Sequence, residues 1–321
     1  MKILITGAAG FIGYHLSEKL LIEKNIVFGI DNINNYYDVR LKKDRLSNLK
    51  LYKNFHFNKV SLFYKNKINK IIKENNIKYI VHLAAQAGVR HSIINPESYF
   101  KNNIEGFFNI LEISKQNKIK HLVFASSSSV YGNNKIFPLT ENMFTDKPLS
   151  FYAATKKSNE VMAYSYSNIY KLPSTALRFF TVYGPFGRPD MALYKFTNSI
   201  LKNKKIDLFN AGEHMRDFTY VDDIVEGILG IIKKPSIEKI PYNCFNIGEG
   251  KPSKLKLFLS LIEKNLKKKA RITNLTLQRG DVKKTHSSIK LLQKYSFYKP
   301  KTSIQEGIKI FISWYKKYYK I

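Results

Sequence analysis

The sequence has 321 residues, 44% of them hydrophobic and 14% aromatic, which is enough for a globular core in one large domain or two unequal ones. It contains neither the roughly 18 apolar residues of a membrane helix nor a signal-peptide pattern, and its single cysteine, Cys244, excludes internal disulfides and cysteine-based metal sites, so we expect a soluble cytoplasmic protein without a metal. The net charge of +30 comes almost entirely from lysines scattered along the chain, with eight arginines among 54 basic residues, which argues against a nucleic-acid surface.

Strands and helices alternate through the first 180 residues. Short β-branched or aromatic runs predict strands at residues 2–6, 26–30, 55–60, 79–83, 121–126 and 174–179. Longer amphipathic stretches predict helices, most clearly near residues 13–23, 65–74, 97–116 and 152–170. This repeated order implies an α/β fold with a doubly wound, Rossmann-type parallel sheet covered on both faces.

The alternation ends after Tyr183. A loop rich in glycine and proline at 184–189 is followed by shorter helices, a segment at 216–221 and a lysine-rich helix near 253–268. We see no internal repeat or low-complexity linker. We therefore predict a Rossmann domain over residues 1–182 and a smaller, mainly substrate-binding lobe over residues 183–321, with some chain returning to the main domain and a cleft between the two.

A glycine-rich turn follows the first predicted strand and opens the first helix. Its candidate cofactor contacts are Gly7, Gly10, Phe11, Ile12 and Gly13. The glycines allow a tight turn and a close backbone approach, so that a pyrophosphate can sit on free N–H groups at the helix N-terminus. Asp31 ends the second strand 18 residues later, where a carboxylate accepts hydrogen bonds from an adenosine ribose and repels a 2′-phosphate. The motif predicts NAD rather than NADP, although Asp31 also suits the cap of the loop that follows.

Tyr152 and Lys156 lie one helical turn apart, 25 residues or more after Ser127 at the end of a predicted strand. A nearby ammonium stabilises a phenolate, so we expect the pKa of Tyr152 to fall toward neutrality. Tyr152 could then remove a proton from a sugar hydroxyl while a hydride leaves the same carbon. A surface Tyr-Lys pair is the alternative, but the Rossmann opening favours Ser127, Tyr152 and Lys156 as a catalytic set.

Together these motifs resemble the extended short-chain dehydrogenase/reductase family, whose pattern is Gly-x-x-Gly-x-x-Gly, a serine or threonine, then Tyr-x-x-x-Lys. Within that family, residues 82–90, 150–160 and 178–192 look like those of the UDP-glucuronate 4-epimerases, and the resemblance covers the whole chain. It implies that Tyr152 takes the 4-hydroxyl proton, that Ser127 shares this hydrogen bond and that Lys156 binds the nicotinamide ribose. NAD would accept the C4 hydride and return it to the other face of a 4-keto sugar, so the cofactor stays bound.

Residues after the catalytic serine separate the reactions of this family. By resemblance, the 4,6-dehydratases carry an Asp-Glu pair where this chain has Ser128 and Ser129, and the decarboxylases carry a glutamate in place of Ser129. The resemblance places Ser127, Ser128, Ser129, Thr181 and Arg188 around the hexuronate end of the sugar, where hydroxyl groups can donate hydrogen bonds to a carboxylate. The alternative is that the serines only close a turn.

The same resemblance extends the candidate site. Further cofactor contacts would be Asn32, Ser61, Leu62, Leu83, Ala84, Ala85 and Asn102, and further substrate contacts would be Arg90, Met191, Arg216 and Arg279. Arg216 matches a family arginine that binds phosphate. Arg279 replaces a proline and either contacts phosphate or is exposed. Ser61 replaces an aspartate that contacts adenine in many relatives, so NAD would bind less tightly or through backbone groups.

The leading hypothesis is 4-epimerisation of UDP-glucuronate to UDP-galacturonate, a precursor step for bacterial capsule or lipopolysaccharide polymers. The first alternative is a UDP-glucose or UDP-N-acetylhexosamine 4-epimerase, and the second is a catalytically idle NAD-binding or nucleic-acid-associated protein. Besides the UDP-sugar we expect no nucleic acid and no membrane as partners. The resemblance also implies a homodimer formed through the helices near residues 97–116 and 152–170.

Overall fold

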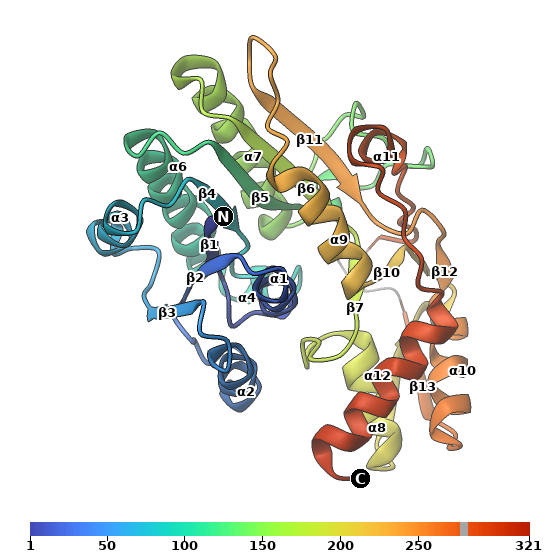
Figure 1. The fold of residues 1–321 in the computed structure, drawn as a ribbon. Helices are drawn as coiled ribbons and strands as arrows, with labels where there is room; N and C mark the ends of the chain where they lie inside the picture. The colour runs from blue at the N-terminus through green and yellow to red at the C-terminus, as the bar shows by residue number, and fades with distance from the viewer. Residues whose placement is uncertain (277–281) are drawn as a thin grey trace.

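A parallel sheet of seven strands forms the centre of the protein, in the order β3-β2-β1-β4-β5-β6-β11 (Figure 1). The computed structural model describes residues 1–276 and 282–321. The strands are β1 (Lys2–Thr6), β2 (Ile26–Asp31), β3 (Phe55–Lys59), β4 (Tyr79–His82), β5 (His121–Ser127), β6 (Ser174–Phe179) and β11 (Tyr242–Ile247). All six predicted strands are confirmed, with ends that differ by no more than one residue, and so is the Rossmann-type α/β fold.

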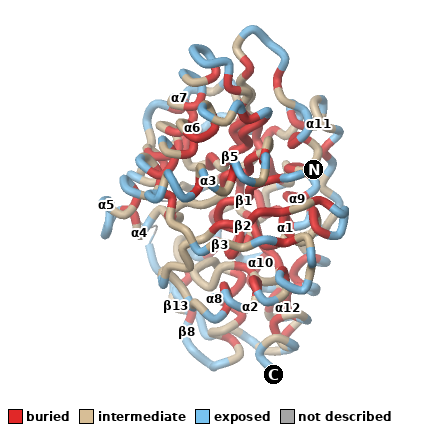
Figure 2. The backbone as a smooth tube through the Cα atoms, turned by 60° about the vertical axis from the view of Figure 1, so that its left-hand side comes forward, coloured by how far each residue is buried: buried red, intermediate tan, exposed pale blue. Residues whose placement is uncertain are grey.

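Helices cover both faces of this sheet. On one face lie α3 (Lys65–Glu74), α6 (Gly106–Gln116) and α7 (Phe151–Tyr170), and on the other lie α1 (Phe11–Ile22), α2 (Val39–Lys50) and α9 (Val221–Ile232). Figure 2 shows that the buried residues concentrate along the central strands. Helix α2 is not among the helices predicted from the sequence. This helix is largely polar, and its buried apolar side chains are Leu41, Leu46 and Leu49.

The helix predicted at residues 97–116 is interrupted. A short helix α5 (Pro96–Tyr99) leads through a wide, π-helical segment η1 (Phe100–Glu105) into α6. The wide turn directs the Asn103 side chain inward, where its Oδ1 accepts a hydrogen bond from Gln86 N at 2.8 Å and its Nδ2 donates to Thr155 Oγ1 at 3.0 Å. Asn103 therefore ties the loop after β4 to α7, consistent with the frequent use of π-helical turns near functional sites.

After residue 180 the chain builds three small two-stranded sheets and several helices. The strand pairs are β7 (Thr181–Tyr183) with β10 (Phe218–Tyr220), β8 (Lys205–Phe209) with β13 (Arg271–Leu275), and β9 (Met215–Arg216) with β12 (Ser253–Lys254). The helices are α8 (Ala192–Leu201), α10 (Leu255–Leu266), α11 (Lys290–Ser296) and α12 (Ile304–Tyr319), and short turns are α4 (His91–Ile94), η2 (Ser128–Tyr131) and η3 (Asn210–Gly212).

Helices α8, α10 and α12 lie together to one side of the large sheet (Figure 1). The predicted lysine-rich helix is confirmed as α10. Strand β11 belongs to the chain beyond residue 183 but pairs with β6 in the large sheet. The division into two domains between residues 182 and 183 stays a prediction. Within the described ranges, no helix has the length and apolar character needed to cross a membrane.

A buried ion pair joins α7 to the sheet. Arg178 of β6 donates from Nε and Nη2 to the two carboxylate oxygens of Glu160, each at 2.9 Å. Ser126 of β5 donates to the same carboxylate at 2.5 Å. The two charged side chains are only 6% and 5% exposed, so this contact fixes α7 against the carboxyl ends of β5 and β6.

Candidate active site

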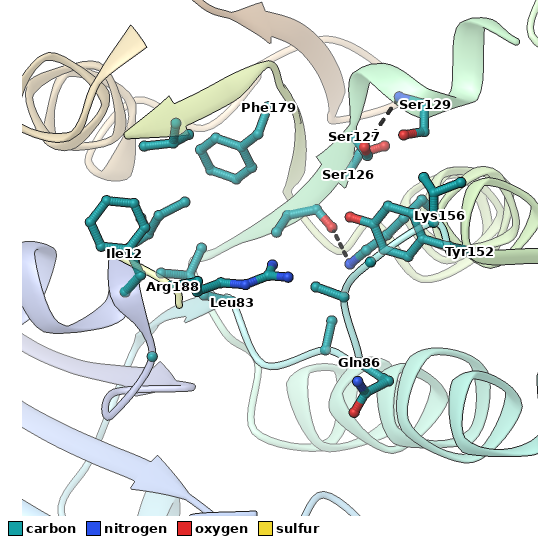
Figure 3. A pocket seen from close by; sticks show the side chains of 18 of the residues that line it. Ile12, Leu83, Gln86, Ser126, Ser127, Ser129, Tyr152, Lys156, Phe179 and Arg188 are labelled. Atoms are coloured by element: carbon teal, nitrogen blue, oxygen red, sulfur yellow. Dashed lines mark hydrogen bonds between the residues drawn. The ribbon is translucent and has the colours of Figure 1, made fainter. Parts of the chain in front are cut away.

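A cavity of about 460 Å³ opens at the carboxyl ends of the parallel strands. It runs from the turn after β1, past the loop after β4 and the turn after β5, to the start of α7 and the loop after β7 (Figure 3). The predicted residues that line it are Gly7, Gly10, Phe11, Ile12, Gly13, Asp31, Asn32, Ser61, Leu62, Leu83, Ala84, Ala85, Asn102, Ser127, Ser128, Ser129, Tyr152, Lys156, Thr181, Arg188, Met191 and Arg216. The fold thus brings most of the predicted site to one place.

The glycine turn is shaped by contacts that no side chain would allow. Gly7 has φ +73°, and a Cβ atom there would lie 2.9 Å from the backbone nitrogen of Ala84. A Cβ atom on Gly13 would lie 2.1 Å from the carbonyl oxygen of Gly7. Helix α1 begins after Gly10, which has no side chain to cap the first N–H groups. The turn therefore fits an anionic group such as a pyrophosphate at the helix N-terminus.

Asp31 links the end of β2 to this turn. Its Oδ2 accepts a hydrogen bond from Ala9 N at 3.2 Å, and its Oδ1 accepts one from Ile33 N at 2.7 Å. Asp31 thus caps the loop that follows it, as the alternative interpretation held. Burial raises the pKa of Asp31 above its ordinary value, while its two backbone hydrogen bonds and the nearby Lys42 and Arg45 oppose this shift. Each carboxylate oxygen retains acceptor capacity for a ligand hydroxyl.

The serine turn after β5 presents hydroxyl groups to the cavity. The Ser127 oxygen accepts a hydrogen bond from the backbone N–H of Ser129 at 3.1 Å (Figure 3). The Ser127 hydroxyl keeps its proton to donate, and its interaction with the Tyr152 phenol lowers the pKa of that phenol. The 3₁₀ turn η2 carries Ser128 and Ser129 along the same wall. The serines therefore both close a turn and line the cavity.

Tyr152 and Lys156 extend from the first turns of α7 into the cavity (Figure 3). Ser150 caps this helix by accepting a hydrogen bond from Ala153 N at 3.2 Å. The ammonium of Lys156 donates to the carbonyl oxygen of Ala125 in β5 at 2.7 Å. Burial lowers the pKa of Lys156 to about 8, so the amine is mostly protonated near pH 7 and loses its proton just above it.

The predicted fall in the pKa of Tyr152 is wrong for this structure. Burial raises the pKa of its phenol, and the hydrogen bond with Ser127 and the charge of Arg188 oppose this shift without reversing it. Lys156 directs its ammonium to the Ala125 carbonyl, and burial lowers the pKa of that ammonium as well. Spacing along a helix predicted the neighbourhood of the two groups but gave no measure of their desolvation.

Arg188 enters the cavity from the loop after β7, and its guanidinium points toward Tyr152 and Lys156 (Figure 3). Asp190 holds it through two hydrogen bonds, from Nε to Oδ1 at 3.0 Å and from Nη2 to Oδ2 at 2.5 Å. The hydroxyl of Tyr36 also donates to Asp190 Oδ2, at 3.4 Å. The orientation of Arg188 is therefore fixed, and part of its charge is balanced by its own neighbour.

The other predicted arginines have different outcomes. Arg216 lines the cavity and donates to the carbonyl oxygen of Met215 at 3.0 Å. Arg90 is not among the residues that line the cavity, and its guanidinium packs over the Phe209 ring, 5.0 Å from the ring centre. Its predicted contact with the substrate stays a prediction. Arg279 lies outside the described residues.

Sequence reasoning missed several residues that line the cavity. They are Tyr36, Tyr37, Lys42, Gln86 and Lys284, among others. Tyr36 and Tyr37 follow Asp31 closely, so the end of a parallel strand was a usable signal for both. Lys284 reaches the cavity because its backbone pairs with Met215, next to Arg216, a contact between distant segments that no local pattern predicts.

Comparisons with known proteins agree with this geometry. The sequence matches the NAD dependent epimerase/dehydratase family over residues 3–248. The protein CapI of Staphylococcus aureus is 50% identical, with all of both chains covered. A probable UDP-glucuronate 4-epimerase of Rhizobium meliloti is 41% identical, with 100% of this chain and 98% of that protein covered.

A solved structure is also similar. The UDP-glucuronic acid 4-epimerase from Bacillus cereus, in complex with UDP-glucuronic acid and NAD, superposes with a TM-score of 0.93 at 33% identity, covering 99% of this chain and 100% of that one. Its fold and the family match account for the glycine turn, the serine and the Tyr-Lys pair that converge on the cavity. The chain therefore belongs to the NAD dependent epimerase/dehydratase family, and it is an NAD-dependent nucleotide-sugar epimerase.

Proposed function

We propose that the protein interconverts UDP-glucuronate and UDP-galacturonate by inverting C4, in the cytoplasm, as a step toward capsule or lipopolysaccharide polymers. The observation that carries the proposal is the wall of hydroxyl donors at Ser127, Ser128, Ser129 and Thr181, with the Arg188 guanidinium in the same cavity as Tyr152. Such a wall can bind a carboxylate by several hydrogen bonds. The name of the Bacillus cereus relative and that of CapI support the substrate and the capsule role.

The proposed function gives a task to each group that lines the cavity. Tyr152 would accept the proton of the C4 hydroxyl, and Ser127 would donate a hydrogen bond to the oxygen of that hydroxyl. NAD, when bound, would supply the hydride acceptor for C4. The Gly7–Gly13 turn would hold its pyrophosphate and Asp31 its adenosine ribose, while Arg216 would bind the diphosphate of the sugar nucleotide.

The distribution of carboxylates favours epimerisation over elimination or decarboxylation. Among the described residues that line the cavity, Asp31 is the only carboxylate, and it follows β2. Strands β1 and β4 lie between β2 and β5, so Asp31 is three strand positions from the serine turn, about 14 Å at the usual spacing. No acid among these lining residues stands where removal of water or CO2 from the sugar would need one.

A 4-epimerase of a neutral sugar, UDP-glucose or a UDP-N-acetylhexosamine, is the second candidate. One observation favours it: Asp190 already binds Arg188 through two hydrogen bonds, which reduces the positive charge available to a uronate carboxylate. The hydroxyl wall can also hydrogen-bond neutral sugar hydroxyls. The catalytic set is the same for both substrates, so only substrate discrimination separates them.

We also propose a homodimer formed through α6 and α7. Phe108 of α6 is 45% exposed, and Val161 and Tyr164 of α7 are 57% and 47% exposed. The two helices lie side by side on one face of the sheet (Figure 1). Exposed apolar side chains on adjacent helices are typical of a helix-pair interface.

Turnover of UDP-glucuronate is the direct test. Purified protein with bound NAD should convert it to UDP-galacturonate, seen by proton NMR as inversion at C4 without net oxidation. Tyr152→Phe removes the proton acceptor and should lower kcat by about 10²–10⁴-fold while NAD stays bound. Tyr170→Phe, on an exposed part of the same helix, is the control and should keep full activity. Absence of product from wild-type protein that holds NAD would contradict the proposal.

Arg188→Ala tests the acidic substrate. If the guanidinium binds the carboxylate, kcat/KM for UDP-glucuronate should fall about 10–100-fold, the range of a charge-assisted hydrogen bond, and kcat/KM for UDP-glucose should fall much less. Arg271→Ala, at an exposed position, is the matched control. Unchanged turnover of the uronate, with efficient turnover of a neutral sugar, would overturn the uronate assignment and favour the second candidate.

Lys156 predicts a pH dependence of stability. Its pKa is about 8 in the folded protein and about 10.4 in an unfolded chain, so between these values the unfolded state binds more protons at this residue. The contribution of Lys156 to the free energy of unfolding therefore rises with pH across this window. The free energy of unfolding is measured in urea for wild type and for Lys156→Met. The difference, wild type minus variant, should increase by about 1–2 kcal/mol between pH 7.5 and pH 9.5. A difference that stays constant would show that Lys156 titrates normally.

The dimer is tested by sedimentation equilibrium. Wild-type protein should show twice the chain mass of 37.3 kDa, and Val161→Glu should shift it to monomer because a buried unpaired charge destabilises the interface. Leu51→Glu, at an 82% exposed position that ends α2 on the opposite face of the sheet, should stay dimeric. A wild-type monomer at micromolar concentrations would refute the interface.

A further inference from the structure

We propose that Arg45 is a positioning residue that holds the glycine turn and the Arg188 loop in one fixed relation, and so couples cofactor binding to the sugar end of the cavity. Arg45 lies on α2, and its side chain is completely buried. It is not among the residues that line the cavity. The part concerning the sugar rests on the proposed role of Arg188.

Three hydrogen bonds define the position of Arg45. Nη1 donates to the carbonyl oxygen of Ala9 at 2.8 Å and to the hydroxyl of Tyr37 at 2.7 Å. Nη2 donates to the carbonyl oxygen of Phe186 at 2.5 Å. Ala9 belongs to the glycine turn, and Phe186 lies two residues before Arg188. One planar guanidinium therefore joins the two segments directly.

The loop that Arg45 holds is under conformational constraint. Phe186 adopts a left-handed conformation with φ +53°. A Cβ atom on Gly187 would lie 2.9 Å from the carbonyl oxygen of Gly184. A non-glycine residue at φ > 0 persists only where its surroundings determine it. The hydrogen bond to the Phe186 carbonyl is one of the contacts that hold this conformation, and Arg188 follows from it along the chain.

Helix α1 supports the same loop from the other side. His15 makes a 2.9 Å hydrogen bond with the carbonyl oxygen of Pro185. The Phe186 ring packs against Tyr14, 5.0 Å between ring centres, and against Trp314, 4.9 Å between ring centres. The loop is thus fastened to the helix that starts at the glycine turn, and Arg45 is the group that also binds the turn itself.

The charge of Arg45 is not explained by packing alone. Its three acceptors are two carbonyl groups and a phenol, and within the described chain its guanidinium makes no ion pair with a carboxylate. Its Nε is buried without a hydrogen-bond partner. The Asp31 carboxylate acts on this charge without forming an ion pair with it. A buried charge without a direct carboxylate partner is costly compared with an apolar side chain of similar size. Its location behind the glycine turn places positive potential where a pyrophosphate would bind.

These contacts give the coupling a direction. A pyrophosphate on the glycine turn would fix the Ala9 peptide and be attracted by the Arg45 charge. A fixed Arg45 would in turn hold the Phe186 carbonyl and restrain Arg188 before sugar binding. The cavity would therefore have its sugar end ordered by its cofactor end, through one side chain that touches neither ligand.

Arg45→Met is the test, with Arg40→Met on the exposed face of the same helix as the matched control. NAD affinity is measured by calorimetry on protein stripped of cofactor, and amide hydrogen exchange is followed in peptides covering residues 184–191 with and without NAD. We expect Arg45→Met to weaken NAD binding about tenfold or more and to speed exchange in the loop. We also expect NAD to slow loop exchange in wild type and in Arg40→Met but not in Arg45→Met.

Arg45→Lys separates the charge from the bridge. A lysine keeps the positive charge but cannot span the acceptors as a planar fork, so it should restore part of the NAD affinity and leave the loop exchange fast. Thermal unfolding confirms that each variant is folded. Wild-type NAD affinity and wild-type loop exchange in Arg45→Met would overturn the proposal, as would weaker NAD binding with the NAD effect on the loop intact.

These measurements need no sugar substrate, so they stand even if UDP-glucuronate is not turned over. Where a sugar is turned over, a double-mutant cycle adds a kinetic readout. If Arg45 acts through the Arg188 loop, Arg188→Ala should reduce kcat/KM less in Arg45→Met than in wild type. Strictly additive losses would contradict the route through Arg188.

Discussion

Arg178 of β6 and Glu160 of α7 form a bidentate ion pair beneath the cavity, joined by Ser126 of β5. Glu160 is one helical turn beyond Lys156 and two turns beyond Tyr152, so the three side chains share one face of α7. The pair therefore sets the rotation of α7 about its axis, and with it the approach of Tyr152 to Ser127. Such a pair costs desolvation, which two parallel charge-assisted hydrogen bonds offset only when the geometry is held.

Burial has opposite effects on the two reactive groups of α7. It raises the pKa of the Tyr152 phenol and lowers that of the Lys156 amine, because each loses hydration of its charged form. In the described chain, the groups that favour the Tyr152 phenolate are the Ser127 hydroxyl and the Arg188 charge. Asp190 holds Arg188 through two hydrogen bonds and balances part of the charge that acts on Tyr152.

Local patterns predicted the sheet and most of the cavity. Hydrophobic runs marked six strands, and in a parallel sheet their carboxyl ends must meet, which is why the glycine turn, Asp31, Ser127 and Tyr152 could be placed together from sequence. Groups that depend on tertiary contacts were out of reach. Helix α2 is too polar for its hydrophobic periodicity to be recognised, so Lys42 and Arg45 were missed. The contact of Arg90 with the Phe209 ring joins segments that are distant in sequence, and no local pattern predicts it.

The residues proposed for the chemistry shared by the family differ from those proposed to distinguish one reaction from another. In the proposed mechanism, the proton and hydride chemistry needs Ser127 at the end of β5, Tyr152 and Lys156 on α7, and a dinucleotide. The product would then depend on the groups that meet the remainder of the sugar, which under this proposal are the serine turn and the loop that carries Arg188. That loop follows β7 and is fastened back to α1 and α2 by His15 and Arg45. If Arg188 selects the substrate as proposed, substrate choice would rest on a loop that contacts α1 and α2, and residues behind the glycine turn could affect specificity without touching a sugar.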